Sequence, residues 1–277
     1  MIGFFDSGYG GLTVLKACQH ALPEHDYAYL GDNGRAPYGG LDSENILAYT
    51  RQGVAFLFAQ GCELVILACN TSSAVALRTI QQNDLARHDG RKKVLGVVVP
   101  LAEAVQAQLA AQPLSRRRAA LIGTAATVQS QAYEKEINKL DPRITIISQA
   151  CPRLVPLIER SPQAKEEMAG WLGYYLKRVV DLAPAVLVPA CTHYALIEPE
   201  IKKTLPASIA VMNGPQVVAG KLMQYLGRHT RLRGRLPLTG QRFFFTSGEP
   251  TAFDRFASQT LGSPVCCTQV KNLADFK

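Results

Sequence analysis

Short apolar segments alternate with longer amphipathic segments along the whole 277-residue chain, and this alternation limits the folds open to it. Within the longer segments, residues of one helix face recur at three- and four-residue steps, as Leu47, Thr50, Val54, Leu57 and Phe58 do in the helix expected over 43–60. Strands and helices in such alternation predict an α/β chain whose mainly parallel sheets are flanked by helices on both faces. The expected strands are 2–5, 27–31, 64–68, 94–99, 119–123, 144–148, 185–189, 209–212 and 243–246.

The composition fits a globular chain with a sizeable core, because apolar residues make up 47% of it and charged residues 19%. The apolar runs are far shorter than the roughly 20 residues that span a bilayer, and no secretory signal is recognisable, so we expect no membrane contact. The seven cysteines are odd in number and lack a C-x-x-C pair, which indicates free thiols in a reducing cytoplasm.

Two pairs of strand ends resemble each other, which indicates two related lobes that face one another. Ala68-Cys69-Asn70-Thr71 and Ala190-Cys191-Thr192-His193 both follow an apolar strand, and the loops that begin at Asp6 and Gly123 form the second pair. We expect a discontinuous first lobe of residues 1–93 and 207–277 and a second lobe of residues 94–206, with the first crossing in the charged stretch that includes Asp89. Ligands of such sheets bind at the carboxyl ends of the strands, so the expected site lies in the cleft between the lobes.

The strand-end cysteines, Cys69 and Cys191, are the strongest candidates for chemistry. A cysteine between a strand and a helix amino terminus meets unpaired N–H groups and the positive end of the helix dipole, which favour the thiolate and lower the pKa of the thiol. Thr71 and Thr192 follow these cysteines, and their hydroxyl and N–H groups can hold a carboxylate. Two thiols across one cleft suit removal of a proton from one face of a carbon and its return to the other. Buried packing is the alternative for any single cysteine, and we assign it to Cys18, Cys62, Cys151, Cys266 and Cys267.

His193 stands two residues after Cys191, where it can assist proton transfer or, alternatively, cap a helix. A zinc site of Cys69, Cys191 and His193 is disfavoured, because C-x-H is not a usual zinc spacing and no fourth ligand stands out, so we expect no metal. The loop Asp6-Ser7-Gly8-Tyr9-Gly10-Gly11 fits neither the dinucleotide fingerprint nor the P-loop. Asp6 is better suited to accept hydrogen bonds from an ammonium group or to act as a base near Cys69, unless the loop is simply an N-capped turn.

The segment 31–40 contains more Gly and Pro than a simple connection needs, which indicates a binding loop, although Asp32 and Arg35 can form a contact internal to it. Basic clusters occur at 91–93, 116–118 and 228–235, and the net charge is +8. No aromatic platform or nucleic-acid motif accompanies these clusters. Solvated loops therefore explain them more simply than nucleic-acid binding does.

Taken in order, the motifs of the chain resemble those of the glutamate racemase family over essentially the whole length. They are Phe5-Asp6-Ser7-Gly8-x-Gly10-Gly11, Gly31-Asp32 with Pro37-Tyr38-Gly39, Ala68-Cys69-Asn70-Thr71, Gly123-Thr124-x-x-Thr127, Cys151-Pro152-x-x-Val155-Pro156-x-x-Glu159 and Cys191-Thr192-His193-Tyr194. The tail Phe244-Phe245-Thr246-Ser247-Gly248-Glu249-Pro250 is similar to the closing segment of that family. The chain departs from the family pattern at Asn33, Val99, Ala195 and Asn213, positions that do not belong to the thiol pair.

The resemblance implies a cofactor-independent enzyme with two α/β lobes, usually a homodimer, that interconverts L- and D-glutamate and supplies D-glutamate for bacterial peptidoglycan. It implies that the catalytic groups are the thiols of Cys69 and Cys191, assisted by Asp6, Glu159 and His193. It implies substrate contacts at Asp6, Ser7, Tyr38, Gly39, Asn70, Thr71, Thr192 and His193.

Two other functions stay open from the sequence. Racemisation of aspartate or another acidic amino acid is the nearer alternative, because a pocket distinguishes side chains that differ by one methylene by only about 1–3 kcal/mol. A non-catalytic protein that binds nucleic acid or another partner through its basic surface is the alternative from a different class.

Overall fold

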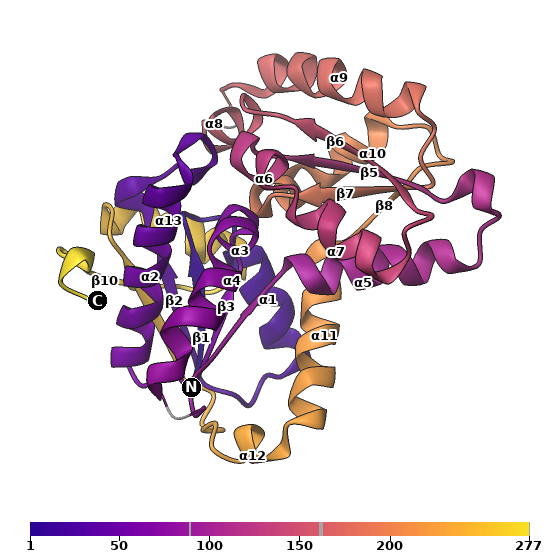
Figure 1. The fold of residues 1–277 in the computed structure, drawn as a ribbon. Helices are drawn as coiled ribbons and strands as arrows, with labels where there is room; N and C mark the ends of the chain where they lie inside the picture. The colour runs from indigo at the N-terminus through magenta and orange to yellow at the C-terminus, as the bar shows by residue number, and fades with distance from the viewer. Residues whose placement is uncertain (89, 161–162, 277) are drawn as a thin grey trace.

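A six-stranded and a four-stranded sheet form the framework of the computed structural model, which describes residues 1–88, 90–160 and 163–276 (Figure 1). The first sheet has the order β10-β9-β2-β1-β3-β4 and contains β1 (Ile2–Asp6), β2 (Tyr27–Gly31), β3 (Leu64–Leu67), β4 (Lys93–Gly96), β9 (Arg242–Thr246) and β10 (Thr268–Gln269). The second has the order β6-β5-β7-β8 and contains β5 (Arg118–Gly123), β6 (Thr145–Ala150), β7 (Val186–Ala190) and β8 (Ala210–Val211). All the pairings are parallel, which confirms the predicted α/β fold.

The second sheet repeats the order of the first. Strands β2-β1-β3-β4 of one sheet correspond in sequence order to β6-β5-β7-β8 of the other, so β3 and β7 occupy equivalent positions. Cys69 follows β3 and Cys191 follows β7. The two cysteine-containing strand ends are therefore similar because they occupy equivalent positions in two sheets of the same topology.

Thirteen α-helices and several short helical turns connect these strands within the described ranges. The α-helices are α1 (Leu12–Ala21), α2 (Ser43–Ala59), α3 (Asn70–Val75), α4 (Leu77–Thr79), α5 (Val98–Ala110), α6 (Ala125–Ser130), α7 (Ala132–Leu140), α8 (Leu154–Glu159), α9 (Lys165–Asp181), α10 (Glu198–Thr204), α11 (Gly214–Arg228), α12 (Thr230–Arg233) and α13 (Pro250–Leu261). The turns are η1 (Asn33–Arg35), η2 (Tyr38–Gly40), η3 (Ile80–Asp84), η4 (Leu85–His88), η5 (Leu114–Arg116), η6 (Thr192–Ile197) and η7 (Leu273–Asp275).

Alternate side chains of each strand face different apolar cores. In β1, Phe4 belongs to a core that also contains Leu15 of α1, whereas Phe5 packs with Val54 and Leu57 of α2 on the opposite face. A third core lies between the second sheet and helices α8, α9 and α10. Strands covered on both faces are expected to be apolar at nearly every position, as β1 and β3 are.

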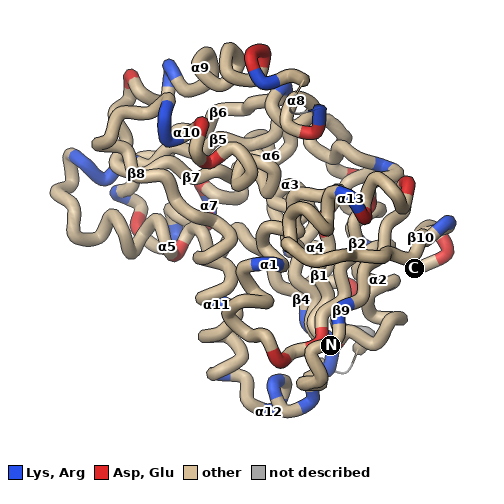
Figure 2. The backbone as a smooth tube through the Cα atoms, turned by 180° about the vertical axis from the view of Figure 1, so that it is seen from behind, with Lys and Arg blue, Asp and Glu red and all other residues tan. Residues whose placement is uncertain are grey.

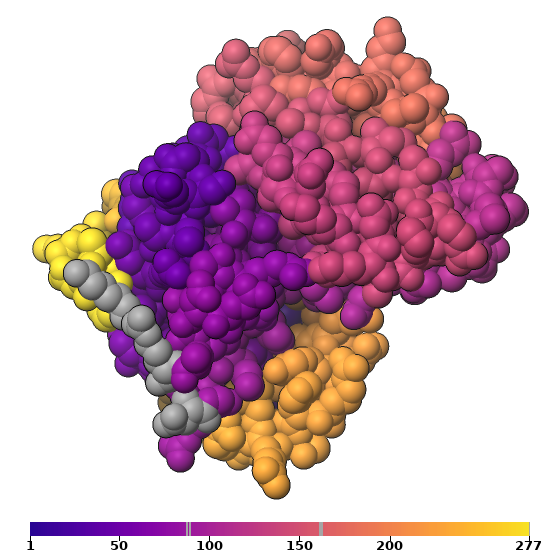
Figure 3. All heavy atoms as spheres, viewed as in Figure 1, coloured from indigo at the N-terminus to yellow at the C-terminus, as the bar shows by residue number. Residues whose placement is uncertain are grey.

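The first of these cores is shared by both lobes. It includes Leu101 of α5, Ile137 of α7 and Leu222 of α11 together with inward-facing residues of β1, β5 and β7. In the space-filling view the two lobes lie directly against each other, and α11 extends beside the first lobe (Figures 1 and 3). Burial of a continuous apolar surface therefore holds the lobes together without a linker domain.

The structure differs from the expected elements at two places. The strand expected over 94–99 ends at Gly96, and helix α5 begins at Val98 because Ser73 Oγ accepts hydrogen bonds from Val97 N at 3.0 Å and Val98 N at 3.4 Å. Strand β10 was not expected, because a two-residue edge strand has no readable periodicity.

The sheets divide the chain later than the expected crossings at 93 and 206. Strand β4, over Lys93–Gly96, pairs with β3 and belongs to the first sheet. Strand β8 pairs with β7 and belongs to the second sheet, so the chain returns to the first lobe after Val211. Asp89, in the charged stretch expected to mark the crossing, lies outside the described residues.

The basic clusters lie at the periphery of the fold, for example around α12 (Figure 2). Arg235 pairs with Glu63 at 2.6 Å, and Arg117 pairs with Asp141 at 2.9 Å. Among the described residues, no helix combines the length and the apolar character needed to cross a bilayer.

We expect Gly53→Ala to lower the free energy of unfolding. A Cβ atom at Gly53 would lie 2.3 Å from the Phe5 ring, so α2 would have to move away from β1. Overpacking of this kind costs about 1–3 kcal/mol, which exceeds the gain of about 1 kcal/mol from the higher helix propensity of Ala. Urea denaturation followed by circular dichroism measures the change.

Gly170→Ala is the matched control, because Gly170 is exposed in α9 and, apart from its chain neighbours and the backbone of its own helix, no described atom lies within 4 Å of the added Cβ. This variant should gain roughly 0.5–1 kcal/mol of stability. Equal stability changes in the two variants would contradict the close contact between α2 and β1.

Candidate active site

A cavity of about 180 Å³ lies between the lobes, where the carboxyl ends of the central strands meet. Ten of the eleven sequence-predicted site residues line it: Ser7, Tyr38, Gly39, Cys69, Asn70, Thr71, Glu159, Cys191, Thr192 and His193. The remaining one, Asp6, is fully buried behind the wall, where it accepts a hydrogen bond from Thr192 Oγ1 at 3.1 Å. The topology thus brings together residues from both sheets that are far apart in the sequence.

Cys69 reaches the cavity from the first lobe as the N-cap residue of α3. Its Sγ atom is 3.4 Å from Ser7 Oγ and 3.5 Å from Ser72 N. Burial, together with the nearby carboxyl group of Asp6, raises the pKa of the Cys69 thiol above its ordinary value. The prediction of a lowered pKa is therefore wrong for Cys69, because removal from water outweighs the hydrogen bonds that its sulfur accepts.

Cys191 reaches the cavity from the second lobe, between β7 and η6. Its Sγ atom is 3.9 Å from His193 Nδ1, and His193 Nε2 is 2.9 Å from Glu159 Oε1. Burial lowers the pKa of His193, but its contacts with Cys191 and Glu159 outweigh this effect and raise it to about 10. His193 is therefore protonated at neutral pH, and its ring lies between the carboxyl group of Glu159 and the sulfur atom of Cys191.

Asp6 connects the first lobe to the second at the floor of the site. It accepts hydrogen bonds from Gly8 N at 2.9 Å and from Thr192 Oγ1, while burial raises its pKa above the ordinary value. A Cβ atom at Gly10 would lie 2.3 Å from Thr192 Oγ1, and one at Gly11 would lie 2.6 Å from Asp6 Cβ. Gly10 therefore permits close packing between the lobes, and Gly11 permits close packing of the loop against Asp6 within the first lobe.

Three threonine hydroxyls form a second contact between the lobes. Thr71 Oγ1 lies 2.9 Å from Thr124 Oγ1 and 3.2 Å from Thr127 Oγ1, and Thr124 and Thr127 are 3.0 Å apart. Thr124 and Cys151 also line the cavity, although neither was predicted as a site residue. The sequence could have predicted Thr124 as a site residue from its strand-end motif Gly123-Thr124-x-x-Thr127, whereas its pattern indicated only buried packing for Cys151.

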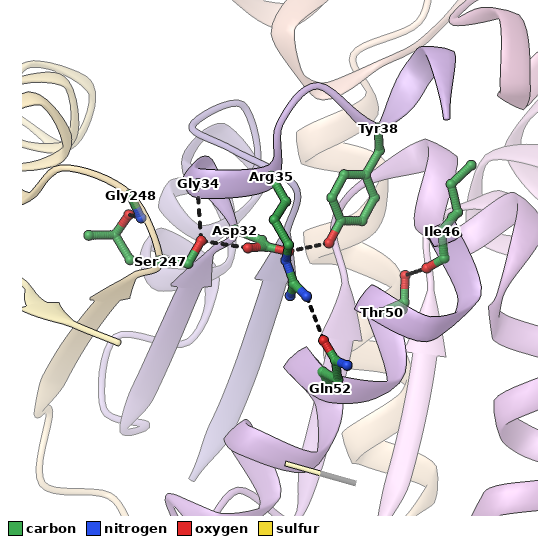
Figure 4. A network of polar contacts seen from close by, with 10 residues as sticks. Asp32, Gly34, Arg35, Tyr38, Ile46, Thr50, Gln52, Ser247 and Gly248 are labelled. Atoms are coloured by element: carbon green, nitrogen blue, oxygen red, sulfur yellow. Dashed lines mark hydrogen bonds and ion pairs between the residues drawn. The ribbon is translucent and has the colours of Figure 1, made fainter. Parts of the chain in front are cut away.

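The loop after β2 brings Tyr38 and Gly39 to the cavity, and a polar network fixes its shape (Figure 4). Asp32 is fully buried and accepts hydrogen bonds from Arg35 Nε at 2.8 Å, from the Tyr38 hydroxyl and from Ser247 Oγ. Asp32 and Arg35 are thus an internal pair of the loop. A Cβ atom at Gly39 would lie 2.7 Å from Thr124 Cβ, so the loop packs closely against the second lobe.

Most of the cavity wall is apolar, and its polar part consists mainly of neutral hydrogen-bonding groups. Among the described residues that line the cavity, none is Lys or Arg, and the acidic and basic side chains are those of Glu159 and His193. In the three described ranges, no group of three or more His, Cys, Asp or Glu side chains is arranged to hold a metal ion. The site can therefore offer hydroxyl, amide and N–H donors to an anionic ligand, and its two thiols to a reacting carbon.

Comparison with known proteins gives a consistent result, although no protein-family model matches the chain. A glutamate racemase of Phenylobacterium zucineum is 37% identical, covering 95% of this chain and 98% of the relative, and one of Paracoccus denitrificans is 36% identical over 95% and 97%. The structure of glutamate racemase isoform RacE1 from Bacillus anthracis superimposes with a TM-score of 0.88 at 29% identity, covering 99% of this chain and 98% of that one.

A second solved structure, glutamate racemase from Francisella tularensis in complex with D-glutamate, superimposes with a TM-score of 0.86 at 27% identity, covering 99% of this chain and 98% of that one. An aspartate racemase from Picrophilus torridus, at 16% identity and a TM-score of 0.54 over 83% of this chain and 97% of that one, shares the fold. The two sequence relatives, at 37% and 36% identity over nearly their whole length, show the family of this chain. The chain belongs to the glutamate racemase family.

Proposed function

We propose that this protein interconverts L- and D-glutamate by proton transfer between two thiols, without a cofactor. The observation that carries the proposal is that Cys69 and Cys191, which follow equivalent strands of two different sheets, line the same cavity. The family membership supports glutamate as the substrate, and the Francisella relative was solved in complex with D-glutamate.

The reaction requires one base and one acid on opposite faces of the α-carbon. The thiolate of one cysteine removes the α-proton: the Cα–H bond breaks, an S–H bond forms, and the electron pair stays on the carbon. The thiol of the other cysteine then donates its proton to the opposite face, which inverts the centre. Two groups of the same chemical type suit an exchange whose reactant and product have equal energy.

Each thiol has its own partner for proton exchange. Asp6 lies close enough to Cys69 for its charge to raise the pKa of that thiol, and burial raises the pKa of Asp6 itself, which makes its carboxylate a stronger base. Cys191 contacts His193, which holds a proton at neutral pH and is oriented by Glu159. These contacts support assisting roles for Asp6, His193 and Glu159 in restoring the thiols after each turnover.

The substrate carboxylates are held by neutral donors. Asn70, Thr71 and Thr192 stand beside the two cysteines, and their hydroxyl and amide groups suit the α-carboxylate, where negative charge develops as the proton leaves. Ser7, Tyr38 and Gly39 bind the rest of the molecule in this proposal. Hydrogen-bond donors in a buried cavity stabilise such charge more strongly than water does.

The family membership also supports a proposal for the setting of the activity. We propose that the protein is a cytoplasmic homodimer that supplies D-glutamate for peptidoglycan. The free state of the cysteines supports a reducing compartment, since all seven lack a disulfide partner among the described residues.

The direct test is incubation with L-glutamate in D₂O, with optical rotation and α-deuteration followed together. We expect rotation to fall to zero while one deuterium enters each product molecule, because the returned proton comes from solvent. L-aspartate measured in parallel tests the nearer alternative. Faster turnover of aspartate would assign the other substrate, and salt-dependent nucleic-acid binding without any exchange would contradict an enzyme altogether.

Replacing either thiol should separate exchange from racemisation. We expect Cys69→Ala and Cys191→Ala each to lower the rate of racemisation by at least about 10³-fold, because one face of the carbon loses its proton carrier. Each variant should still exchange the α-proton of one enantiomer, and the two variants should differ in which one. Cys18→Ala, a buried thiol in α1 outside the cavity, should keep the wild-type rate. Unchanged racemisation in Cys191→Ala would refute the two-thiol mechanism.

The ion pair of His193 predicts a pH dependence of stability. The pKa of His193 is about 10 in the folded protein against an ordinary value of 6.5, so the folded form binds the proton more tightly than the unfolded chain does. Its contribution is complete below about pH 6.5 and is lost as the pH rises toward 10. The free energy of unfolding of wild type relative to His193→Gln should therefore fall by about 1 kcal/mol per pH unit across this window.

Urea denaturation of both proteins at several pH values measures this difference. In Glu159→Gln the decline should end at a lower pH, because one of the contacts that raise the pKa of His193 is gone. A difference between wild type and His193→Gln that is constant from pH 6.5 to 9.5 would contradict the ion pair.

A further inference from the structure

Asn70 makes a contact across the lobes that the proposed mechanism does not use. It is the first residue of α3, directly after Cys69, and its side chain lines the cavity. Its Oδ1 atom accepts a hydrogen bond from the hydroxyl group of Tyr133, which belongs to α7 in the second lobe. Tyr133 is only 1% exposed and does not itself line the cavity.

The chemistry of this pair fixes the orientation of the amide. Burial and the nearby thiols of Cys191 and Cys69 raise the pKa of Tyr133, so its hydroxyl keeps its proton and needs an acceptor. Among the described residues, Asn70 Oδ1 is that acceptor. A buried donor without an acceptor costs about 1–3 kcal/mol, which disfavours the flipped amide. With Oδ1 directed to Tyr133, the NH₂ group is the part of the Asn70 side chain that remains for a ligand in the cavity that this residue lines.

We propose that Tyr133 is a positioning residue that orients the Asn70 amide so that its NH₂ group donates to the α-carboxylate of the bound amino acid. This inference rests on the proposed function, because it takes Asn70 as a contact of the substrate. Among the described residues, the cavity wall contains no Lys or Arg, so an amide donor of fixed orientation would contribute strongly to binding a carboxylate there. Because Asn70 and Tyr133 come from different lobes, the amide of Asn70 is oriented only when α3 and α7 are packed together.

The orientation is tested by Asn70→Asp, which keeps an oxygen for the Tyr133 hydroxyl and replaces the NH₂ donor with an oxygen. A carboxyl group at this buried position should lower the melting temperature, which is measured in parallel. Its kcat/KM for L-glutamate should fall more than tenfold, because an oxygen and a negative charge now face the substrate carboxylate. Retention of kcat/KM within about threefold would show that the NH₂ group of Asn70 does not donate to the substrate.

Tyr133→Phe removes only the hydroxyl group and should lower kcat/KM about tenfold, since the amide is then free to flip. In an Asn70→Ala background the same change should lower kcat/KM by less than twofold, because no amide remains to be oriented. If the hydrogen bond were only structural, the fold-decrease in kcat/KM of the double variant would equal the product of the fold-decreases of the two single variants. If Tyr133→Phe does not fold, Asn70→Asp alone decides the question.

Tyr27→Phe is the matched control. Tyr27 is equally buried, and its hydroxyl donates to Leu22 O at 2.9 Å, away from the cavity. This variant should lose stability without a change in kcat/KM. Wild type is assayed first, and absence of glutamate racemisation would refute the proposed function. If wild type is active, two results would overturn the role of Tyr133 without affecting the proposed function. They are retained kcat/KM in Asn70→Asp, and a double variant whose loss of kcat/KM is the product of the losses in the single variants.

Discussion

One apolar core, shared by the two sheets, is the constraint on which the rest of the structure depends. Side chains of β1, β5 and β7 and of helices α1, α5, α7 and α11 belong to it. Since this core is packed from both lobes at once, the lobes cannot separate without exposing apolar surface to water. It therefore keeps the carboxyl ends of β3 and β7, and the cysteines that follow them, at the same cavity.

Above this core, the contacts between the lobes near the cavity are polar and lie within hydrogen-bonding distance. The hydroxyl groups of Thr71, Thr124 and Thr127, the bond from Thr192 to Asp6 and the bond from Tyr133 to Asn70 all join one lobe to the other. Buried polar groups with satisfied hydrogen bonds specify a single arrangement more strictly than apolar contacts do. The apolar core holds the lobes together, and these hydrogen bonds fix the position of one lobe relative to the other.

The two thiols are equivalent in topology but differ in surroundings. Cys69 lies near a buried carboxyl group, whereas Cys191 lies beside a histidine that is protonated at neutral pH. Similar motifs in the sequence thus do not give the two sulfur atoms the same surroundings, because other elements also contribute groups to each environment. Asp6 comes from β1, and Glu159, which raises the pKa of His193, comes from α8.

The order of strands and helices, the α/β class and the group of residues that meets at the cavity could be predicted from the sequence. The fold class and the meeting of the two cysteines follow from local periodicity and from the rule that parallel strands end at one edge of a sheet, whereas Tyr38, Gly39 and Glu159 were expected from the family resemblance. The end of β4 at Gly96, the raised pKa of Cys69, the place of Cys151 in the wall and the contact from Tyr133 to Asn70 were decided by the tertiary structure. Each of these depends on burial or on a partner distant in the chain, which no local pattern of residues encodes.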